Sequence, residues 1–531
     1  MITLRKINKI LIKLIYISLF FLLLGFSYAF FTANITGSES TTTITVTGGT
    51  MDITFNGGNN INMGNMLPRE AAWGTKTFTV TGNNTTTLTM NYHLNLIIES
   101  NTFSYDALKY KLTSTNTGAN GTIAPSMTWM RGVGTGARDI FLGNGSFTGP
   151  TSGDKVHTYV LDIYFPETGE NQNYDQGKSF SAHIEILGGT GASNTYLTDA
   201  LIDSYGGASN ITEAPAGTFD NINGETENVM YKMEDDYGMS YYLRGAKDYV
   251  NNNIIFAEHQ WKIVRINGDG SIRIIYNGTC PNNSCIINTT GISTQIGESA
   301  FNTHISTAIW NTTYYYDNKY MGYMYGGAAG EASTSRMQAT TNETSSTIKI
   351  YLDNWYLTNI QNKGYHSYIS DTLFCNDRQL EGELEVVGYF TGTGFGTSNT
   401  AYAAPQRLAN TKNPNIKCAQ KNDRFTVSDT VKGNGALTYP IGLLTPDETA
   451  IAGLKFNASN FTNYLHTNQY WWTLGPGLWS VGIAYAVCVY SHGSLIIYNV
   501  SNGGGARGVL NLKSETQVTG TGTTSDPFKV V

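Results

Sequence analysis

The sequence predicts a β-rich chain, with a mainly β N-terminal domain followed by an α+β C-terminal domain. Short alternating strands fill residues 30–195, and helix signals appear further on. The length of 531 residues exceeds the ~100–200 residues of one ordinary domain. Charged residues make up 14% of the chain and hydrophobic residues 40%, which excludes charge-rich disorder and a long coiled coil. The net charge of -7 provides no basic field, so we expect no nucleic-acid partner.

The first 29 residues have the order of a secretory signal peptide. Basic residues, among them Arg5 and Lys13, precede an apolar run from Leu14 to Ala29 that ends on small residues. The run is also long enough for an uncleaved anchor, because ~17–25 residues span a bilayer. We therefore expect residues 1–29 to be a signal peptide or a membrane anchor, with the rest of the chain exported to the cell surface.

The five cysteines all lie in the second half of the chain. Cys280 and Cys285 flank a turn-like Pro-Asn-Asn-Ser loop, whose ends could approach to disulfide distance. Cys375 with Cys418 is the second pairing, which leaves Cys488 unpaired. Zinc is the alternative, but the chain has neither Cys-x-x-Cys nor a His at ligand spacing to a Cys. We expect disulfides and no metal.

Residues 30–195 are expected to form a β-sandwich. Glycine and asparagine clusters separate the expected strands, and threonine supplies their solvent face. Several short strands with no helix pattern are typical of this architecture. The expected strands are Thr41–Val46, Met51–Phe55, Thr77–Val80, Leu88–Leu94, Tyr159–Phe165 and Ser179–Leu187.

The segment Tyr28-Ala29-Phe30-Phe31-Thr32 and the later run from Gly48 to Asn56 resemble the start of TasA/camelysin-type secreted proteins. The resemblance covers about residues 20–190. It implies a jelly-roll-like β-sandwich, and several such proteins assemble into extracellular fibres. Some members are described as metallopeptidases, but this chain has no His-Glu-x-x-His. His93, His157 and His183 are therefore expected to be exposed or strand-face histidines.

Residues 196–228 are expected to be a linker with a short helix around Thr198–Ser204, and residues 229–531 a second domain. The strongest hairpin signal of the chain joins the strands Phe256–Ile266 and Ser271–Tyr276 through Asn267-Gly268-Asp269-Gly270. A calcium loop is the alternative interpretation of this turn. It would need several acidic oxygens and a distal glutamate, which are absent.

Helices are expected further along the second domain, and strands at its end. Thr445 begins the best-marked helix as an N-cap, followed by proline and two acidic residues. The expected helices are Thr303–Trp310, Thr347–Asn362 and Thr445–Leu454. The expected strands are Tyr470–Leu474, Tyr485–Tyr490, Ser494–Tyr498 and Val509–Leu512.

Five segments of the second domain resemble, in order, a largely uncharacterised domain abundant in surface proteins of gut bacteria. They are Trp261–Ser271, Leu373–Arg378, Gly442–Glu448, Tyr470–Leu474 and Gly505–Leu512. The later segments also resemble, more distantly, the C-type-lectin-like fold in its formylglycine-generating-enzyme form. Target proteins of diversity-generating retroelements use that fold to display variable ligand-binding residues. This chain departs from the pattern at Gly475-Pro476, usually Ser-Pro, and at Arg507-Gly508, usually Arg-Pro.

The final strands are rich in aromatic and amide side chains, which suit ligand binding. Tyrosine and tryptophan offer large contact area at low entropy cost, and aromatic rings stack on sugar rings. Core packing is the alternative for about half of these aromatics, Trp472 above all. The candidate ligand-binding residues are Tyr470, Trp471, Trp479, Tyr485, Tyr490, His492, Tyr498, Asn499 and Asn502.

No catalytic motif stands out. The chain lacks Gly-x-Ser-x-Gly, and Glu381, Glu383 and Glu385 are best interpreted as a solvated acidic strand. We therefore expect a non-enzymatic cell-surface binding protein without a cofactor, whose C-terminal domain binds an extracellular protein or glycan. A diversified retroelement target is one form of this hypothesis. The alternative is a TasA-type fibre or biofilm-matrix subunit that self-assembles through the sandwich.

Overall fold

The computed structural model describes the chain from residue 42 onward with several gaps. The described ranges are 42–45, 51–56, 61–64, 67–84, 87–117, 121–169, 172–303, 317–327, 331–384 and 392–531. The expected signal or anchor segment 1–29 and nearly all of the expected helix Thr303–Trp310 lie outside them. Strands predominate over helices, which confirms the β-rich α+β class. Among the described residues, no helix is long and apolar enough to cross a membrane.

The described chain separates into two compact units. The first comprises residues up to Asn194, except the short segments Ser104–Asp106 and Gly134–Gly136, which group with the second unit. The second unit continues from Thr195 to Val531. Residues 196–228, expected to be a linker, belong to this second unit.

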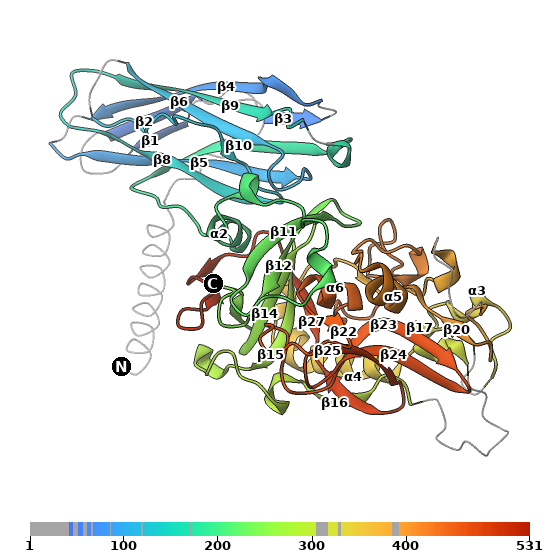
Figure 1. The fold of residues 1–531 in the computed structure, drawn as a ribbon. Coiled ribbons are helices and arrows are strands. Elements are labelled where there is room, and N and C mark those ends of the chain that lie inside the picture. The colour runs from blue at the N-terminus through green and yellow to red at the C-terminus, as the bar shows by residue number, and fades with distance from the viewer. Residues whose placement is uncertain are drawn as a thin grey trace, which may run out of the picture. The chain divides into compact units, whose positions relative to one another are not determined.

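The first unit contains two antiparallel sheets, drawn as two layers in Figure 1. The six-stranded sheet has the order β1-β2-β4-β9-β6-β7 and the four-stranded sheet the order β3-β10-β5-β8. Their bounds are β1 (Thr42–Thr45), β2 (Met51–Asn56), β3 (Ile61–Gly64), β4 (Arg69–Asn84), β5 (Met90–Asn101), β6 (Lys109–Thr117), β7 (Arg131–Gly132), β8 (Arg138–Phe147), β9 (Lys155–Phe165) and β10 (Ser179–Gly188).

The core of this unit is formed by strands in which every second side chain is buried. In β9, Tyr159, Leu161 and Ile163 are fully buried, while the residues between them are half-buried. Leu94 and Leu96 of β5 join the same core cluster from the other sheet. Because successive side chains point to opposite faces, β5 and β9 each give one face to the core and turn a more exposed face away from it.

The three histidines of this unit differ in environment. His157 is fully buried, and its Nδ1 lies 2.5 Å from the Tyr92 hydroxyl. His157 is thus a strand-face histidine, on the buried face of β9. His183 lies 3.0 Å from Glu99, and His93 contacts the Gly189 carbonyl at 3.1 Å. The described residues contain no cluster of three or more metal-ligating side chains.

The second unit contains two larger sheets (Figure 1). One has the order β11-β12-β14-β13-β29-β28, with β15 paired to β14 and to β27. The other has the order β16-β26-β23-β24-β25-β22, with β20 paired to β23. The bounds in the first of these are β11 (Asn228–Glu234), β12 (Met239–Gly245), β13 (Asn253–Phe256), β14 (His259–Ile266), β15 (Ile272–Thr279), β27 (Val509–Leu512), β28 (Val518–Thr519) and β29 (Phe528–Val530).

The second of these sheets supplies the candidate site, and two short ribbons complete the strands. Its bounds are β16 (Gly297–Ala300), β20 (Thr400–Ala401), β22 (Lys455–Phe456), β23 (Trp471–Ser480), β24 (Ile483–Val489), β25 (Ser494–Asn499) and β26 (Gly503–Ala506). The ribbons pair β17 (Met324–Tyr325) with β18 (Thr344–Ser345) and β19 (Phe374–Cys375) with β21 (Arg424–Phe425).

The predicted hairpin is confirmed as β14 and β15. The Asn267 amide donates to the Ser271 carbonyl at 2.8 Å, which closes the turn. The Asp269 carboxylate accepts from the amide and hydroxyl of Ser271 and from the Thr372 hydroxyl, at 2.6–2.9 Å. This carboxylate therefore acts as a turn residue, because hydroxyl and amide donors already occupy its oxygens.

The helices are short. α2 (Leu197–Ser204) buries Leu197, Leu201 and Ile202 in the core of the second unit, which explains why the expected linker belongs to it. α6 (Pro446–Ile451) begins with the predicted N-cap, because the Thr445 hydroxyl accepts from the Glu448 amide at 3.0 Å. The other α-helices are α3 (Arg336–Ala339), α4 (Thr347–Tyr356) and α5 (Ala403–Gln406), with π-helical turns following α4 at Leu357–Gln361 and α5 at Arg407–Thr411.

Several 3₁₀ turns connect these elements. The residues Glu381 and Glu383, expected on one face of a strand, lie in such a turn instead, and Glu385 falls outside the described residues. The Glu383 carboxylate accepts from the Leu380 amide, which favours a turn over a strand. The turns are η1 (Asn173–Asp175), η2 (Ala208–Asn210), η3 (Thr218–Asp220), η4 (Pro281–Asn283), η5 (Ile292–Thr294), η6 (Asn318–Met321), η8 (Tyr365–Tyr368), η9 (Glu381–Glu383) and η11 (Lys421–Asp423).

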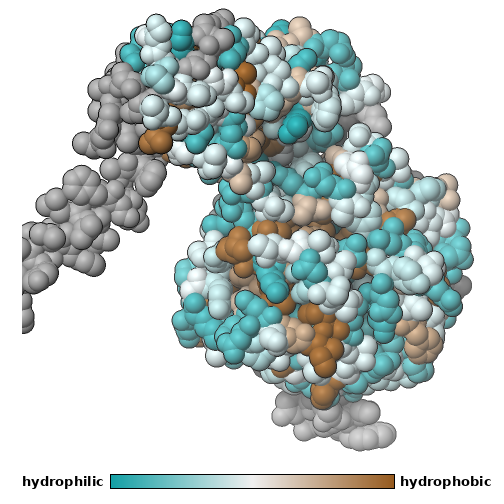
Figure 2. All heavy atoms as spheres, turned by 90° about the vertical axis from the view of Figure 1, so that its left-hand side faces the viewer, coloured by the Kyte–Doolittle hydropathy of each residue, from teal (hydrophilic) through white to brown (hydrophobic). Residues whose placement is uncertain are grey.

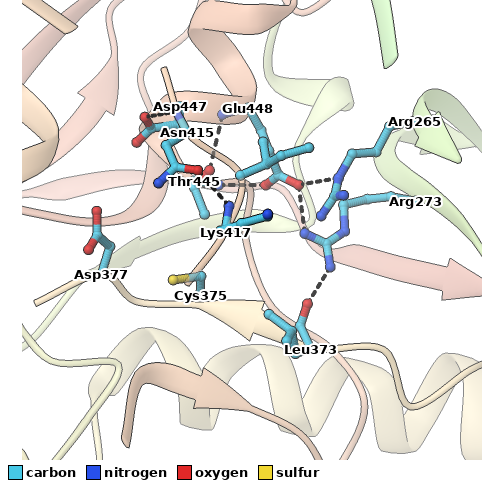
Figure 3. A pocket seen from close by; sticks show the side chains of 11 residues that line it. Arg265, Arg273, Leu373, Cys375, Asp377, Asn415, Lys417, Thr445, Asp447 and Glu448 are labelled. Carbon is cyan, nitrogen blue, oxygen red and sulfur yellow. Dashed lines mark hydrogen bonds and ion pairs between the residues drawn. The ribbon is translucent and has the colours of Figure 1, made fainter. Parts of the chain in front are cut away.

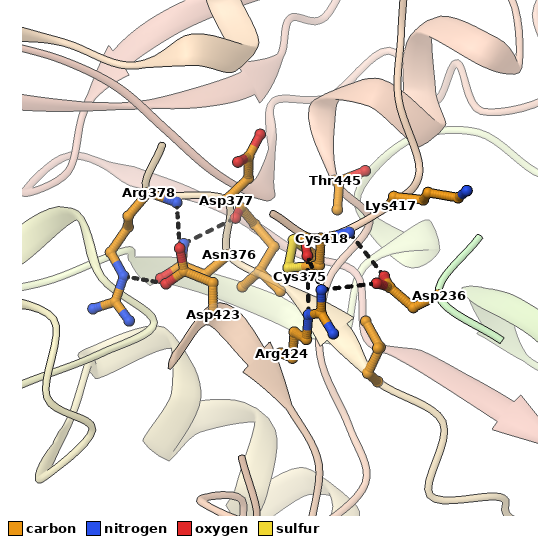
Figure 4. The surroundings of a disulfide bond; sticks show 12 residues. Asp236, Cys375, Asn376, Asp377, Arg378, Lys417, Cys418, Asp423, Arg424 and Thr445 are labelled. Carbon is orange, nitrogen blue, oxygen red and sulfur yellow. Dashed lines mark hydrogen bonds and ion pairs between the residues drawn. A yellow bond between two sulfur atoms is a disulfide. The ribbon is translucent and has the colours of Figure 1, made fainter. Parts of the chain in front are cut away.

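Two disulfides cross-link the second unit. Cys280–Cys285 closes the loop that contains η4, and Cys375–Cys418 ties β19 to the segment before η11. Figure 4 shows the second disulfide beside the Asp236–Arg424 ion pair. Cys488 of β24 is a buried free thiol, and burial raises its pKa to about 12. The two disulfides indicate an oxidising, extracellular environment.

Candidate functional site

The candidate binding face lies on the sheet formed by β23, β24 and β25. Cross-strand register pairs Trp472 with Cys488 and Cys488 with Ile496. Tyr470 lies two residues before Trp472, and Tyr490 lies two residues after Cys488. Both tyrosines therefore point to the same side of the sheet as Trp472 and Cys488. The opposite side carries Trp471 and packs into the main core.

Five aromatic rings follow one another along this face and its adjoining loops, and we call them the aromatic row. Phe461, His492, Tyr490, Tyr470 and Tyr498 are joined by successive centroid distances of 5.7, 4.9, 4.5 and 5.5 Å. Phe461 is 56% exposed and His492 is exposed, while the three tyrosines are half-buried. The row therefore presents aromatic surface to solvent on a rigid sheet.

Packing beneath the row holds its rings in place. The Trp472 ring lies 5.7 Å from the Tyr498 ring, and its indole donates to the Ser299 carbonyl at 2.9 Å. Burial, with the neighbouring Tyr490 hydroxyl, raises the pKa of Tyr470 to about 12. Tyr470 is therefore neutral at physiological pH. The arrangement suits stacking and hydrogen bonding, and it contains no paired acid and base for catalysis.

The structure separates the nine predicted ligand residues into three groups. Tyr470, Tyr490, His492 and Tyr498 come together in the aromatic row. Trp471 and Trp479 are 0% and 3% exposed and lie in the core instead. Trp471 packs against the buried Arg507, whose guanidinium carbon lies 5.0 Å from the centre of its ring.

The remaining three predicted residues lie away from the row. Tyr485 and Asn499 are directly paired across β24 and β25, one residue out of phase with Tyr490 and Tyr498, so they face the other side of the sheet. The Asn499 side chain accepts from Ser501 at 3.0 Å and stabilises the turn that follows β25. Asn502 is exposed beyond this turn.

Sequence reasoning missed Phe461. It stands in an Asn-Phe-Thr-Asn loop with no periodic pattern around it. Its contact with the His492 ring, 31 positions later in sequence, depends on how two loops meet. An isolated apolar residue among polar loop residues was the one available signal.

A second candidate region is a pocket beside α6, with an empty volume of about 330 Å³ including open solvent (Figure 3). Arginines neutralise the acids that line it. Glu448 accepts from Arg265 at 2.9 Å and from Arg273 at 2.6 Å. Arg407 bridges Asp377 and Asp447 at 2.6 and 2.7 Å.

The charged side chains that line this pocket stabilise the fold. Burial alone would raise the pKa of Glu448, but the charges of Arg273 and Arg265 outweigh it and lower that pKa to about 2. Burial raises the pKa of Asp377 to about 6, although Arg407 opposes the rise. Because each carboxylate binds a guanidinium, the network fastens α6 to the β14–β15 hairpin and leaves no free base.

The face drawn in Figure 2 is weakly polar. On the face drawn in Figure 2, apolar residues form small separate patches within a mostly hydrophilic or neutral surface. This agrees with a chain in which 14% of residues are charged. The aromatic row is distinguished by the continuity of its rings rather than by strong hydropathy, because tyrosine and histidine are amphipathic.

Comparison with family models and with curated proteins gave no match to this chain.

Proposed function

We propose that the protein is an exported cell-surface binding protein whose C-type-lectin-like C-terminal domain binds an extracellular glycan or protein through the aromatic row. The observation that carries this proposal is the run of five adjoining rings on one sheet face. Half-exposed tyrosines with a rigid support provide contact area at little entropy cost. The N-terminal unit, a jelly-roll-like sandwich of TasA/camelysin type in this proposal, attaches or spaces the binding domain.

The chemistry of the row favours ligands with both apolar faces and hydroxyl groups. Tyrosine rings stack on the apolar face of a sugar or a peptide side chain, and their hydroxyls exchange hydrogen bonds with polar groups at the edge. His492 adds a donor and acceptor at one end of the row. No charged side chain belongs to the row, so we expect binding to depend weakly on salt.

The test is a binding screen of the mature full chain on immobilised glycans and extracellular matrix proteins. Tyr490→Ala and His492→Ala should each weaken a bound ligand at least tenfold, which corresponds to about 1.4 kcal/mol. Tyr485→Ala is the matched control, because it removes a tyrosine from β24 on the other side of the sheet. Circular dichroism confirms that each variant is folded.

Unchanged binding in Tyr490→Ala and His492→Ala, with loss in Tyr485→Ala, would refute the assignment of the face. The alternative proposal, a fibre subunit, predicts concentration-dependent oligomers in size-exclusion chromatography. A stable monomer that binds a ligand favours the binding protein. Codons for about residues 470–510 repeated beside a reverse-transcriptase gene would mark the chain as a diversified target.

A further inference from the structure

Lys262 of β14 has unusual surroundings for a lysine. Its side chain is 2% exposed, yet within the described part of the chain the hydrogen bonds of its Nζ go to amide oxygens and to no carboxylate. Its Nζ donates instead to the side-chain oxygens of two asparagines, Asn253 at 2.5 Å and Asn288. Buried lysines are rarely left without an anionic partner, so this arrangement calls for an explanation.

The surroundings favour the neutral amine. Burial, helped by the positive charge of Arg507, lowers the pKa of Lys262 to about 7, while Asp248 opposes the change. A neutral amine is then available near pH 7, where an ordinary lysine is almost wholly charged. A neutral amine held against a carbonyl group is a nucleophile, whereas an ammonium is not.

Asn288 is held in place as the amide group that this amine attacks. Its Oδ1 accepts a hydrogen bond from Lys262 Nζ. Its Nδ2 donates to the Lys247 carbonyl at 2.9 Å and to the Thr524 hydroxyl at 3.0 Å, which fixes the plane of the amide. Asn253 is bound at its other end by the Gly522 carbonyl at 2.9 Å.

We propose that Lys262 and Asn288 become joined by an intramolecular amide bond, formed in the folded domain with release of ammonia. Lys262 Nζ adds to Asn288 Cγ and loses a proton, and Nδ2 gains a proton as its bond to Cγ breaks. The Thr524 hydroxyl, in contact with Nδ2, relays this proton. The products are one amide cross-link and one ammonia molecule, so no oxidant, metal or cofactor is needed.

Access and proximity both suit this step. Thr524 is exposed and Asn288 is half-buried, so ammonia has a route to solvent, while the buried side of the site limits competition from water. The reacting groups are held in contact by the fold, which replaces a bimolecular encounter. The bond would span 26 positions of sequence and fasten the segment after the Cys280–Cys285 loop to β14. Unlike a disulfide, it would survive reduction.

The test is intact mass spectrometry of the purified full chain after reduction of its disulfides. The expected mass is lower than the mass calculated from the mature sequence by one ammonia molecule. Peptide mapping should recover a branched peptide that contains both Lys262 and Asn288. The full calculated mass, with the two peptides recovered separately, would overturn the proposal without any variant.

Three variants assign the bond. Lys262→Arg keeps a buried cation but removes the nucleophile, so the ammonia loss should disappear in this variant. If Asn288 instead loses ammonia by forming a succinimide on its own, the lower mass would persist in Lys262→Arg, and this result would refute the cross-link. Asn288→Ala should also restore the full mass, whereas Asn253→Ala should keep the lower mass. Ammonia loss that persists in Asn288→Ala would refute Asn288 as the acceptor.

Discussion

Replacing Glu448 by glutamine removes the anion at the centre of the ionic network beside α6. Glu448 is 2% exposed and holds Arg265 and Arg273 together, and Arg265 also binds Asp235 at 2.7 Å. The variant keeps the shape of the side chain but leaves Arg273 buried without its carboxylate. A buried charge that loses its partner is strongly unfavourable, so we expect a large loss of stability.

The size of the loss follows from the pKa of Glu448. Its fall from 4.5 to about 2 corresponds to about 3 kcal/mol at neutral pH. This value agrees with the ~3–5 kcal/mol that is lost when one partner of a buried ion pair is removed. The stability from this carboxylate is fully present above pH 4.5, since the unfolded state then also carries the charge. It is lost as the pH falls through about 2, where the folded state becomes protonated.

Urea denaturation at pH 7 and at pH 3 measures both effects. The free energy of unfolding of Glu448→Gln should lie below that of the wild type by about 3–5 kcal/mol at pH 7, and the difference should shrink at pH 3. Glu383→Gln is the control, because the Arg336–Glu383 pair is partly exposed and we expect about 0–1 kcal/mol from it. A loss below about 1 kcal/mol at pH 7 in Glu448→Gln would refute the reasoning.

Three further predictions concern packing and cross-links. Cys375→Ser opens a disulfide that spans 43 positions and should lower the free energy of unfolding by about 4 kcal/mol, against about 2 for Cys280→Ser, as measured in urea without reductant. Trp479→Ala should lower the free energy of unfolding by ~3–5 kcal/mol because the ring is buried. An unchanged midpoint of urea unfolding would contradict its core position. Gly475→Ala places a Cβ 2.3 Å from the Pro446 ring and should cost ~1–3 kcal/mol; an unchanged thermal midpoint would show that β23 shifts freely from α6.

Short sequence motifs predicted the elements that are stabilised by interactions between neighbouring residues. The Asn-Gly-Asp-Gly turn predicted the β14–β15 hairpin, because turn chemistry and alternating strands act over a few residues. Thr445 and Glu448 predicted the start of α6 for the same reason. The segment 347–362 was predicted as one helix, but it is α-helical to Tyr356 and then widens into a π turn.

The aromatic row was predicted in part. Composition drew attention to the region around Tyr470 and Tyr490, and it favoured the core for Trp472. It assigned Trp471 to the ligand, whereas both tryptophans are buried, on opposite faces of one strand. Irregular register between Trp472 and Leu478 further hid the position of Trp479. Both tryptophans predicted to bind ligand lie in the core because large rings stabilise the fold most when fully buried.

The sequence by itself determined the strand-rich first unit, the α+β character of the second, the hairpin, the capped helix and the cysteine pairs. These features depend on period, turn residues and short loops, which neighbouring residues set. The tertiary structure decided which rings reach solvent, how Phe461 meets His492, how Glu448 comes to hold two arginines, and why Lys262 faces Asn288. These contacts join residues far apart in the chain, and long-range packing rather than local preference brings them together.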